Sequence, residues 1–112
     1  MKIDEFRKII HEREQCHDEW TYGIERCWKK EIEILSEDIP STIEFLNTEC
    51  TAEEYSWISE VIDDVVEKVP NKELVNCYKN LMSKFPEECQ KCNIAGVIEI
   101  CESMFDSDDV NI

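Results

Sequence analysis

The chain has 112 residues, of which 42% are hydrophobic, and its formal net charge at pH 7 is −15. This length suits one domain, and the hydrophobic content, which includes three tryptophans, excludes a disordered acidic tail. The negative charge argues against direct binding to nucleic acid or to an anionic membrane, because both would repel the chain.

Helical periodicity dominates the first 38 residues. Apolar side chains recur three or four positions apart in two stripes. The first stripe is Ile3, Phe6, Ile9 and Ile10, and the second is Trp20, Ile24, Cys27, Trp28, Ile32 and Leu35. One continuous helix here would be about 50 Å long, whereas the expected radius of gyration of such a domain is about 13 Å. We therefore expect a break between about residues 12 and 23; the alternative is one long projecting helix.

A connector and a short helix are predicted next. Pro40 cannot continue a helix, so the segment 36–40 should end the second helix. Ser41 can then cap a short helix that ends near Thr48.

The clearest helix signal begins at Thr51. Thr51 and Glu54 fit a capping box, in which the threonine side chain accepts from a free amide and the glutamate reaches back to the cap. Apolar residues follow at helical spacing until Pro70 ends the run. They are Tyr55, Ile58, Val61, Ile62, Val65, Val66 and Val69. The pattern predicts one helix over 51–69.

Three more helical segments are predicted toward the C-terminus. Asn71 can cap the next helix, Pro86 suits the first turn of a short segment, and Asn93 precedes the last helix. Residues 106–112 form an acidic tail that we expect to be frayed or disordered. Strand signals are absent, so we predict an all-α fold. It is a single compact domain over 1–112, a bundle of about five or six antiparallel helices.

The cysteines and the apolar segments bear on location and cofactors. The first residues lack the apolar segment of a signal peptide, and no run approaches the roughly 20 apolar residues of a membrane span, so we expect a cytoplasmic protein. Seven cysteines, an odd number, predict thiols mostly in the core. Cys89 and Cys92 form a C-x-x-C pair without the second ligand pair of a zinc site or the βαβ context of a redox pair. We favour no metal site and no cofactor, with metal binding by this pair as the alternative.

Catalytic motifs are not evident. His11, Cys16 and His17 have the side chains of nucleophilic catalysis, but adjacent residues on a helix point about 100° apart, so Cys16 and His17 cannot readily pair. Two glycines cannot build a phosphate-binding loop, and the carboxylates are too numerous to indicate acid–base chemistry. We predict that the protein is not an enzyme.

Between Lys30 and Lys68 the chain holds twelve carboxylates and no lysine, arginine or histidine. Such uncompensated charge destabilises a compact protein, which suggests that a strongly basic partner protein meets this surface. The candidate partner-binding residues lie on the predicted 51–69 helix and are Glu53, Glu54, Trp57, Glu60, Asp63, Asp64 and Glu67. Four further acids are expected to extend this acidic surface: Glu31, Glu33, Glu37 and Asp38.

Each part of this interpretation has an alternative. The acidic face can be a solvated surface kept for solubility. Trp57 lies off the apolar stripe among carboxylates and suits an interface anchor, but it can instead pack against the N-terminal helices.

Three stretches carry a family resemblance: TAEEYSWISEVIDD at 51–64, FPEEC at 85–89 and NIAGVIE at 93–99. Through them the segment from Thr51 to Phe105, about half the chain, resembles small helical immunity proteins of bacterial contact-dependent growth inhibition systems. The resemblance implies a cytoplasmic antidote that binds a delivered toxin domain, commonly a nuclease, and blocks it. An acidic inhibitor fits this role, because nucleases that grip phosphate backbones are basic.

We therefore expect an immunity protein that neutralises a cognate basic toxin domain by stoichiometric binding, with no direct contact to nucleic acid or membrane. Two alternatives stay open. One is an acidic helical regulatory or scaffolding module, and the other is a nucleic-acid mimic that acts on a DNA-binding protein.

Overall fold

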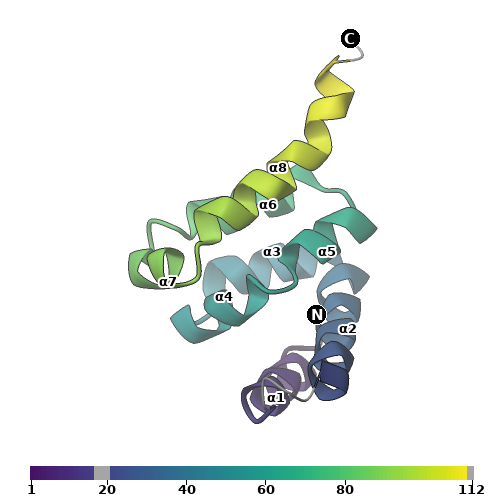
Figure 1. Cartoon of the computed structure of the whole chain (residues 1–112), viewed down its shortest axis with the longest axis vertical. Helices are drawn as coiled ribbons and strands as arrows, with labels where there is room; N and C mark the ends of the chain where they lie inside the picture. The colour runs from purple at the N-terminus through teal and green to yellow at the C-terminus, as the bar shows by residue number, and fades with distance from the viewer. Residues whose placement is uncertain (17–20, 111–112) are drawn as a thin grey trace.

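The computed structural model describes residues 1–16 and 21–110, and of 106–110 it describes the backbone alone. This part of the chain contains eight helices and no strand (Figure 1). They are α1 (Ile3–Glu14), α2 (Thr21–Glu37), α3 (Ile39–Thr48), α4 (Ala52–Ile58), α5 (Ile62–Lys68), α6 (Lys72–Asn80), α7 (Pro86–Lys91) and α8 (Ile94–Val110). The radius of gyration is 13.9 Å, as expected of a compact domain. The all-α class is confirmed, and the expected count of five or six helices is too low.

The two N-terminal apolar stripes form separate helices, as predicted. α1 ends at Glu14, and α1 packs against α2, which one continuous helix could not do. The apolar stripe of α1 faces the core through Phe6, Ile9 and Ile10, which are all buried. His17 and Trp20 lie outside the described residues.

α3 begins earlier than predicted, because its N-cap is Asp38 and not Ser41. The carboxylate of Asp38 accepts hydrogen bonds from the Ser41 hydroxyl at 2.8 Å and from the Ser41 backbone N–H at 3.4 Å. These bonds lower the pKa of Asp38. Pro40 falls in the first turn, where its missing N–H removes no intrahelical bond. The predicted end at Thr48 is confirmed.

The segment 51–69 forms two helices, α4 and α5, where the pattern predicted one. Backbone N–H groups of Ser59, Glu60 and Val61 donate to carbonyls three residues earlier, which makes a tighter turn than an α-helix. The hydroxyls of Ser56 and Ser59 also donate to carbonyls three residues earlier, and such bonds offer the backbone an alternative to the helical ladder. The candidate partner-binding residues therefore do not share one continuous helix face.

The predicted capping box at the start of α4 is present. Thr51 Oγ1 accepts from the backbone N–H of Glu54 at 3.1 Å, and the Glu54 carboxylate accepts from the N–H of Thr51 at 3.0 Å. Replacing Thr51 with alanine is expected to lower the free energy of unfolding, measured by urea denaturation, by about 1 kcal/mol. Thr48→Ala removes a hydroxyl from the exposed end of α3 and is the control. Equal losses in the two variants would contradict a stabilising role of the cap.

Toward the C-terminus, most predicted boundaries are present. The Asn71 side chain caps α6, and Pro86 occupies the first turn of α7. α6 ends at Asn80, before the end of its apolar stripe. Asn93 precedes α8 with φ of 51°, a left-handed conformation that asparagine tolerates better than most residues. α8 extends past Phe105, because the residues that follow include neither glycine nor proline to end it.

One connected set of buried apolar side chains forms the core. Within it Tyr55 of α4 and Tyr78 of α6 lie with their ring centroids 4.5 Å apart and their ring planes tilted by 38°. Each hydroxyl donates to the backbone carbonyl of the other tyrosine, at 3.0 and 2.8 Å, so both buried polar groups are satisfied. The seven cysteines are thiols, and four of them are buried: Cys27, Cys50, Cys77 and Cys101. Among the described helices, none is both long and apolar enough to cross a membrane.

Candidate functional site

The fold separates the twelve carboxylates between Lys30 and Lys68 into distinct groups. Within the described part of the chain, only Glu54 and Glu60 have a cationic group within 4 Å. Glu31 is buried and Asp63 is half-buried. The remaining eight are exposed: Glu33, Glu37, Asp38, Glu44, Glu49, Glu53, Asp64 and Glu67. Most of the negative charge in this run therefore faces solvent without an internal counter-charge.

Glu54, one of the candidate partner-binding residues, acts inside the protein. Its side chain is 9% exposed, and its Oε2 accepts from Arg7 Nε at 2.8 Å. The same carboxylate completes the capping box at Thr51. Glu54 therefore links α1 to α4, and its charge is already compensated.

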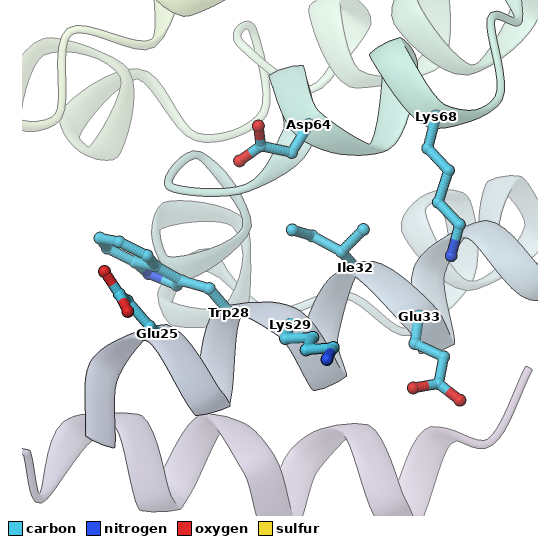
Figure 2. Close-up of a pocket in the computed structure, with 7 residues that line it drawn as sticks. All are labelled: Glu25, Trp28, Lys29, Ile32, Glu33, Asp64 and Lys68. Atoms are coloured by element: carbon cyan, nitrogen blue, oxygen red, sulfur yellow. The ribbon is translucent and has the colours of Figure 1, made fainter. Parts of the chain in front are cut away.

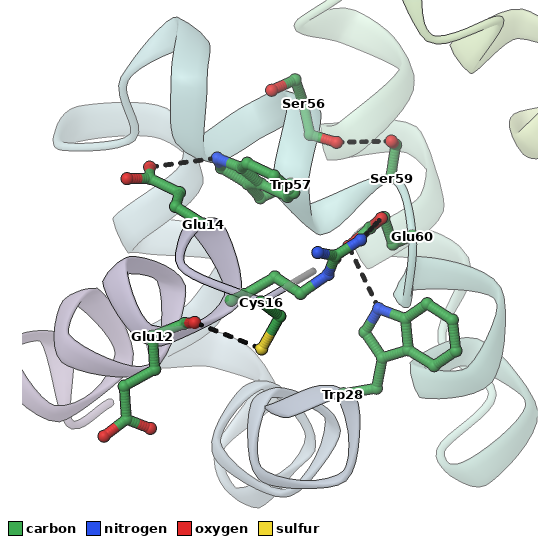
Figure 3. A network of polar contacts seen from close by, with 9 residues as sticks. Glu12, Glu14, Cys16, Trp28, Ser56, Trp57, Ser59 and Glu60 are labelled. Atoms are coloured by element: carbon green, nitrogen blue, oxygen red, sulfur yellow. Dashed lines mark hydrogen bonds and ion pairs between the residues drawn. The ribbon is translucent and has the colours of Figure 1, made fainter. Parts of the chain in front are cut away.

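Glu60, a second candidate, is the centre of a polar network (Figure 3). Arg13 donates to both of its carboxylate oxygens, from Nε at 3.0 Å and from Nη2 at 2.8 Å. Trp28 Nε1 donates to Glu60 Oε1 at 3.0 Å. Burial lowers the pKa of Arg13, but the hydrogen bond and charge of Glu60 outweigh it and hold that pKa above its ordinary value. The network joins α1, α2 and the turn between α4 and α5.

Trp57 packs against α1. This agrees with the alternative given for it, in which it packs against the N-terminal helices and does not serve only as an interface anchor. Its Nε1 donates to Glu14 Oε1 at 3.2 Å, and the Arg13 guanidinium lies 5.0 Å from the centre of its ring (Figure 3). The nearby Glu53 carboxyl group, through hydrogen bonding, raises the pKa of Glu14. Trp57 therefore makes internal contacts and is only partly available to a partner.

Glu31 was expected to extend the acidic surface, and this expectation is wrong. The residue is 0% exposed, and neither carboxylate oxygen has a hydrogen-bond partner among the described residues. Burial, and next the charge of Glu60, raise the pKa of Glu31 to about 8, although Arg13 acts in the opposite direction. The spacing held a signal for this burial, because Glu31 stands four positions after Cys27 and four before Leu35, on the buried side of α2.

Asp64, a third candidate, lies at a surface groove between α2 and α5 (Figure 2). The α2/α5 groove has a volume of about 540 Å³. It is lined by Glu25, Trp28, Lys29, Ile32 and Glu33 of α2 and by Asp64 and Lys68 of α5. Partial burial, and then the carboxylates of Asp63 and Glu67, raise the pKa of Asp64. The fold thus places Asp64 in one groove with Glu25 and Glu33, which lie more than thirty positions earlier in the sequence.

The groove residues on α2 were missed as a site. Trp28 and Ile32 belong to a predicted apolar stripe, and no role was predicted for Glu25. Glu25, Trp28 and Ile32 stand three and four positions apart, so they share one face of a helix, and this spacing was the available signal.

In the described residues, no three side chains of His, Cys, Asp or Glu are placed so that they could hold a metal ion. Cys89 and Cys92 are half-buried thiols at α7. Family models, curated proteins and solved structures give no match for this chain. The described residues form an acidic all-α protein in which eight exposed carboxylates of the run between Lys30 and Lys68 have no internal ion pair.

Proposed function

We propose that this protein is a cytoplasmic immunity protein that neutralises a cognate basic toxin domain, a nuclease, by stoichiometric binding. One observation carries the proposal. Of the twelve carboxylates in the run between Lys30 and Lys68, ten have no cationic group within 4 Å in the described part of the chain, and eight of these are exposed. A basic partner would supply the missing counter-charge.

The physical case rests on what this charge does to the free protein. Like charges at this density repel one another, and binding a cationic surface relieves the repulsion and accelerates the encounter. A nuclease must hold a phosphate backbone with lysine and arginine, so its substrate groove offers such a surface. An acidic protein seated there excludes the substrate, and the proposal requires no direct contact with nucleic acid or membrane.

The candidate contacts are now fewer than the sequence suggested. Glu53, Asp63, Asp64 and Glu67 have no internal ion pair among the described residues, so they are the members of the predicted set available to a partner. Glu54, Trp57 and Glu60 support the fold that presents them.

The proposal predicts that a neighbouring gene encodes a large exported polypeptide with a lysine-rich C-terminal domain, and this domain is the partner used in the test. Mixing the two is expected to give an equimolar complex and to abolish nuclease activity. Replacing Asp64 and Glu67 together with lysine is expected to weaken the complex at least about tenfold, because two attractive charges become repulsive. Glu73→Lys with Glu87→Lys changes the net charge equally at exposed positions on α6 and α7, outside the acidic run, and is the control. A nuclease that stays fully active beside an excess of the wild-type protein would contradict the proposal.

A scaffolding module that self-associates is the second candidate, and α8 gives it specific support. Ile100 is 52% exposed, and Val97 and Met104 lie three and four positions away on the same side of the helix. Sedimentation equilibrium distinguishes the two: the immunity proposal predicts a monomer in the absence of toxin, whereas the module predicts a dimer that Ile100→Glu dissociates.

A further inference from the structure

The α2/α5 groove has two chemically different ends. Figure 2 shows the indole of Trp28 at one end, with the carboxylate of Glu25 on one side of it and that of Asp64 on the other. Lys68 and Glu33 lie at the opposite end. An aromatic ring between two carboxylates provides both kinds of contact that a planar cation can use, stacking and charge-assisted hydrogen bonds.

The indole of Trp28 is held in position from inside the protein. Its Nε1 donates to Glu60 at 3.0 Å, and Glu60 is itself fixed by two hydrogen bonds from Arg13. Trp28 is half-buried, so the ring has one edge in this network while another part of it lines the groove. Because the ring is already held in place, a side chain that stacks on it binds with a smaller loss of conformational entropy.

The two carboxylates at this end are available. Neither Glu25 nor Asp64 has a cationic group within 4 Å among the described residues, and both are exposed. Asp63 and Glu67 add negative charge around Asp64, and after partial burial this charge raises the pKa of Asp64. A bound cation would relieve this repulsion. The lysines Lys29 and Lys68 disfavour a second cation in the same groove, so the groove suits one cationic side chain.

We propose that the α2/α5 groove binds a single arginine side chain of the basic partner, with its guanidinium stacked on Trp28 and paired with Asp64 and Glu25. This inference rests on the proposed function and names one contact within it. Arginine is favoured over lysine because its flat guanidinium both stacks on an aromatic ring and pairs with two carboxylates. The volume of about 540 Å³ accommodates one such side chain with part of its backbone.

The test is an NMR titration of the whole chain with blocked arginine amide, and separately with blocked lysine amide, at low ionic strength. Arginine is expected to shift the Trp28 indole N–H signal and to bind several-fold more tightly than lysine. Glu25→Gln with Asp64→Asn is expected to weaken arginine binding about fivefold to tenfold. Glu44→Gln with Glu73→Gln removes the same charge elsewhere on the surface and should leave binding unchanged.

A nona-arginine peptide, titrated into the same variants, separates this inference from the proposed function. If nona-arginine binds the wild type and both double variants equally, and blocked arginine leaves the Trp28 signal in place, the groove inference is overturned and the acidic-surface function stands. If nona-arginine does not bind the wild type at low ionic strength, both are overturned. Because Glu25 and Asp64 are exposed, their substitution should leave the fold intact, and circular dichroism checks this.

Discussion

Replacing Glu31 with glutamine is expected to stabilise the protein at neutral pH by about 3 kcal/mol. The side chain is 0% exposed, neither oxygen has a hydrogen-bond partner in the described part of the chain, and its pKa is raised to about 8. Folding therefore forces a carboxyl group that is ionised in the unfolded chain at neutral pH to take up a proton. Glutamine has nearly the same shape and requires no proton, so the variant avoids this cost.

The same residue makes stability depend on pH with a definite sign. The pKa of Glu31 is higher in the folded protein, about 8, than its ordinary value of 4.5, so the folded state binds the proton more tightly. The contribution of Glu31 to stability is full below about pH 4.5 and is lost as the pH rises through about 8. Across this range, the free energy of unfolding of the wild type should fall by up to about 1.4 kcal/mol per pH unit because of this residue.

Urea denaturation at several pH values measures the effect. The Glu31→Gln variant should have a flatter profile than the wild type, and the two should converge in acid. Glu33→Gln, an exposed change on the same helix, removes the same charge and should leave the slope near that of the wild type. Equal slopes for Glu31→Gln and the wild type would contradict a proton-linked Glu31.

Among the substitutions proposed here, breaking the pair of Arg13 and Glu60 is expected to lower the free energy of unfolding the most. The Arg13 side chain is 11% exposed and makes two hydrogen bonds to Glu60, and its guanidinium also lies against the Trp57 ring. Arg13→Met leaves the Glu60 carboxylate largely desolvated with only the Trp28 N–H, so we expect a loss of about 3 kcal/mol. A double-mutant cycle with Glu60→Gln should give a coupling energy above about 1 kcal/mol.

The chain contains a matched control for this cycle. Lys79 and Glu102 form an ion pair at 3.2 Å, but their side chains are 51% and 43% exposed. Solvent screens such a pair, so Lys79→Met with Glu102→Gln should show a coupling energy below about 0.5 kcal/mol. Equal coupling in the two cycles would contradict the view that the network around Glu60 fixes α1 and α2 on the rest of the fold.

Local chemistry explains which features of the fold could be predicted. The caps at Thr51 and Asn71 and the first-turn proline of α7 depend on a few neighbouring residues, and the structure confirms all three. The break after Ile58 was missed because its causes, serine hydroxyls bonded to carbonyls, compete with a strong apolar stripe that favours one helix. The cap of α3 was misplaced by three residues because Asp38 and Ser41 are both good caps.

The candidate site was predictable in its charge and not in its geometry. The excess of carboxylates is visible in the sequence, but which of them are paired depends on Arg7 and Arg13, which lie 47 positions away from Glu54 and Glu60. Glu31 was assigned to the surface because it is acidic, although its spacing of four positions from Cys27 and from Leu35 places it on the buried stripe of α2. The groove joins residues of α2 and α5, and no local pattern indicates which helices become neighbours.

The internally paired acids stabilise the scaffold, and the exposed acids remain for a partner. Substitutions in the two groups should therefore have different effects on stability and on binding. Changes at Glu54 or Glu60 should lower stability, whereas changes at Asp64 or Glu67 should leave stability nearly intact and weaken binding.

The most direct test of the central claim is the rate of association with the basic toxin domain as a function of ionic strength. If exposed carboxylates guide and hold the partner, the association rate constant should fall at least about tenfold between roughly 0.02 M and 0.5 M salt. The Asp64→Lys, Glu67→Lys variant should show a shallower dependence than the wild type. A rate constant that does not change with salt, together with crosslinks confined to the apolar side of α8, would contradict the account.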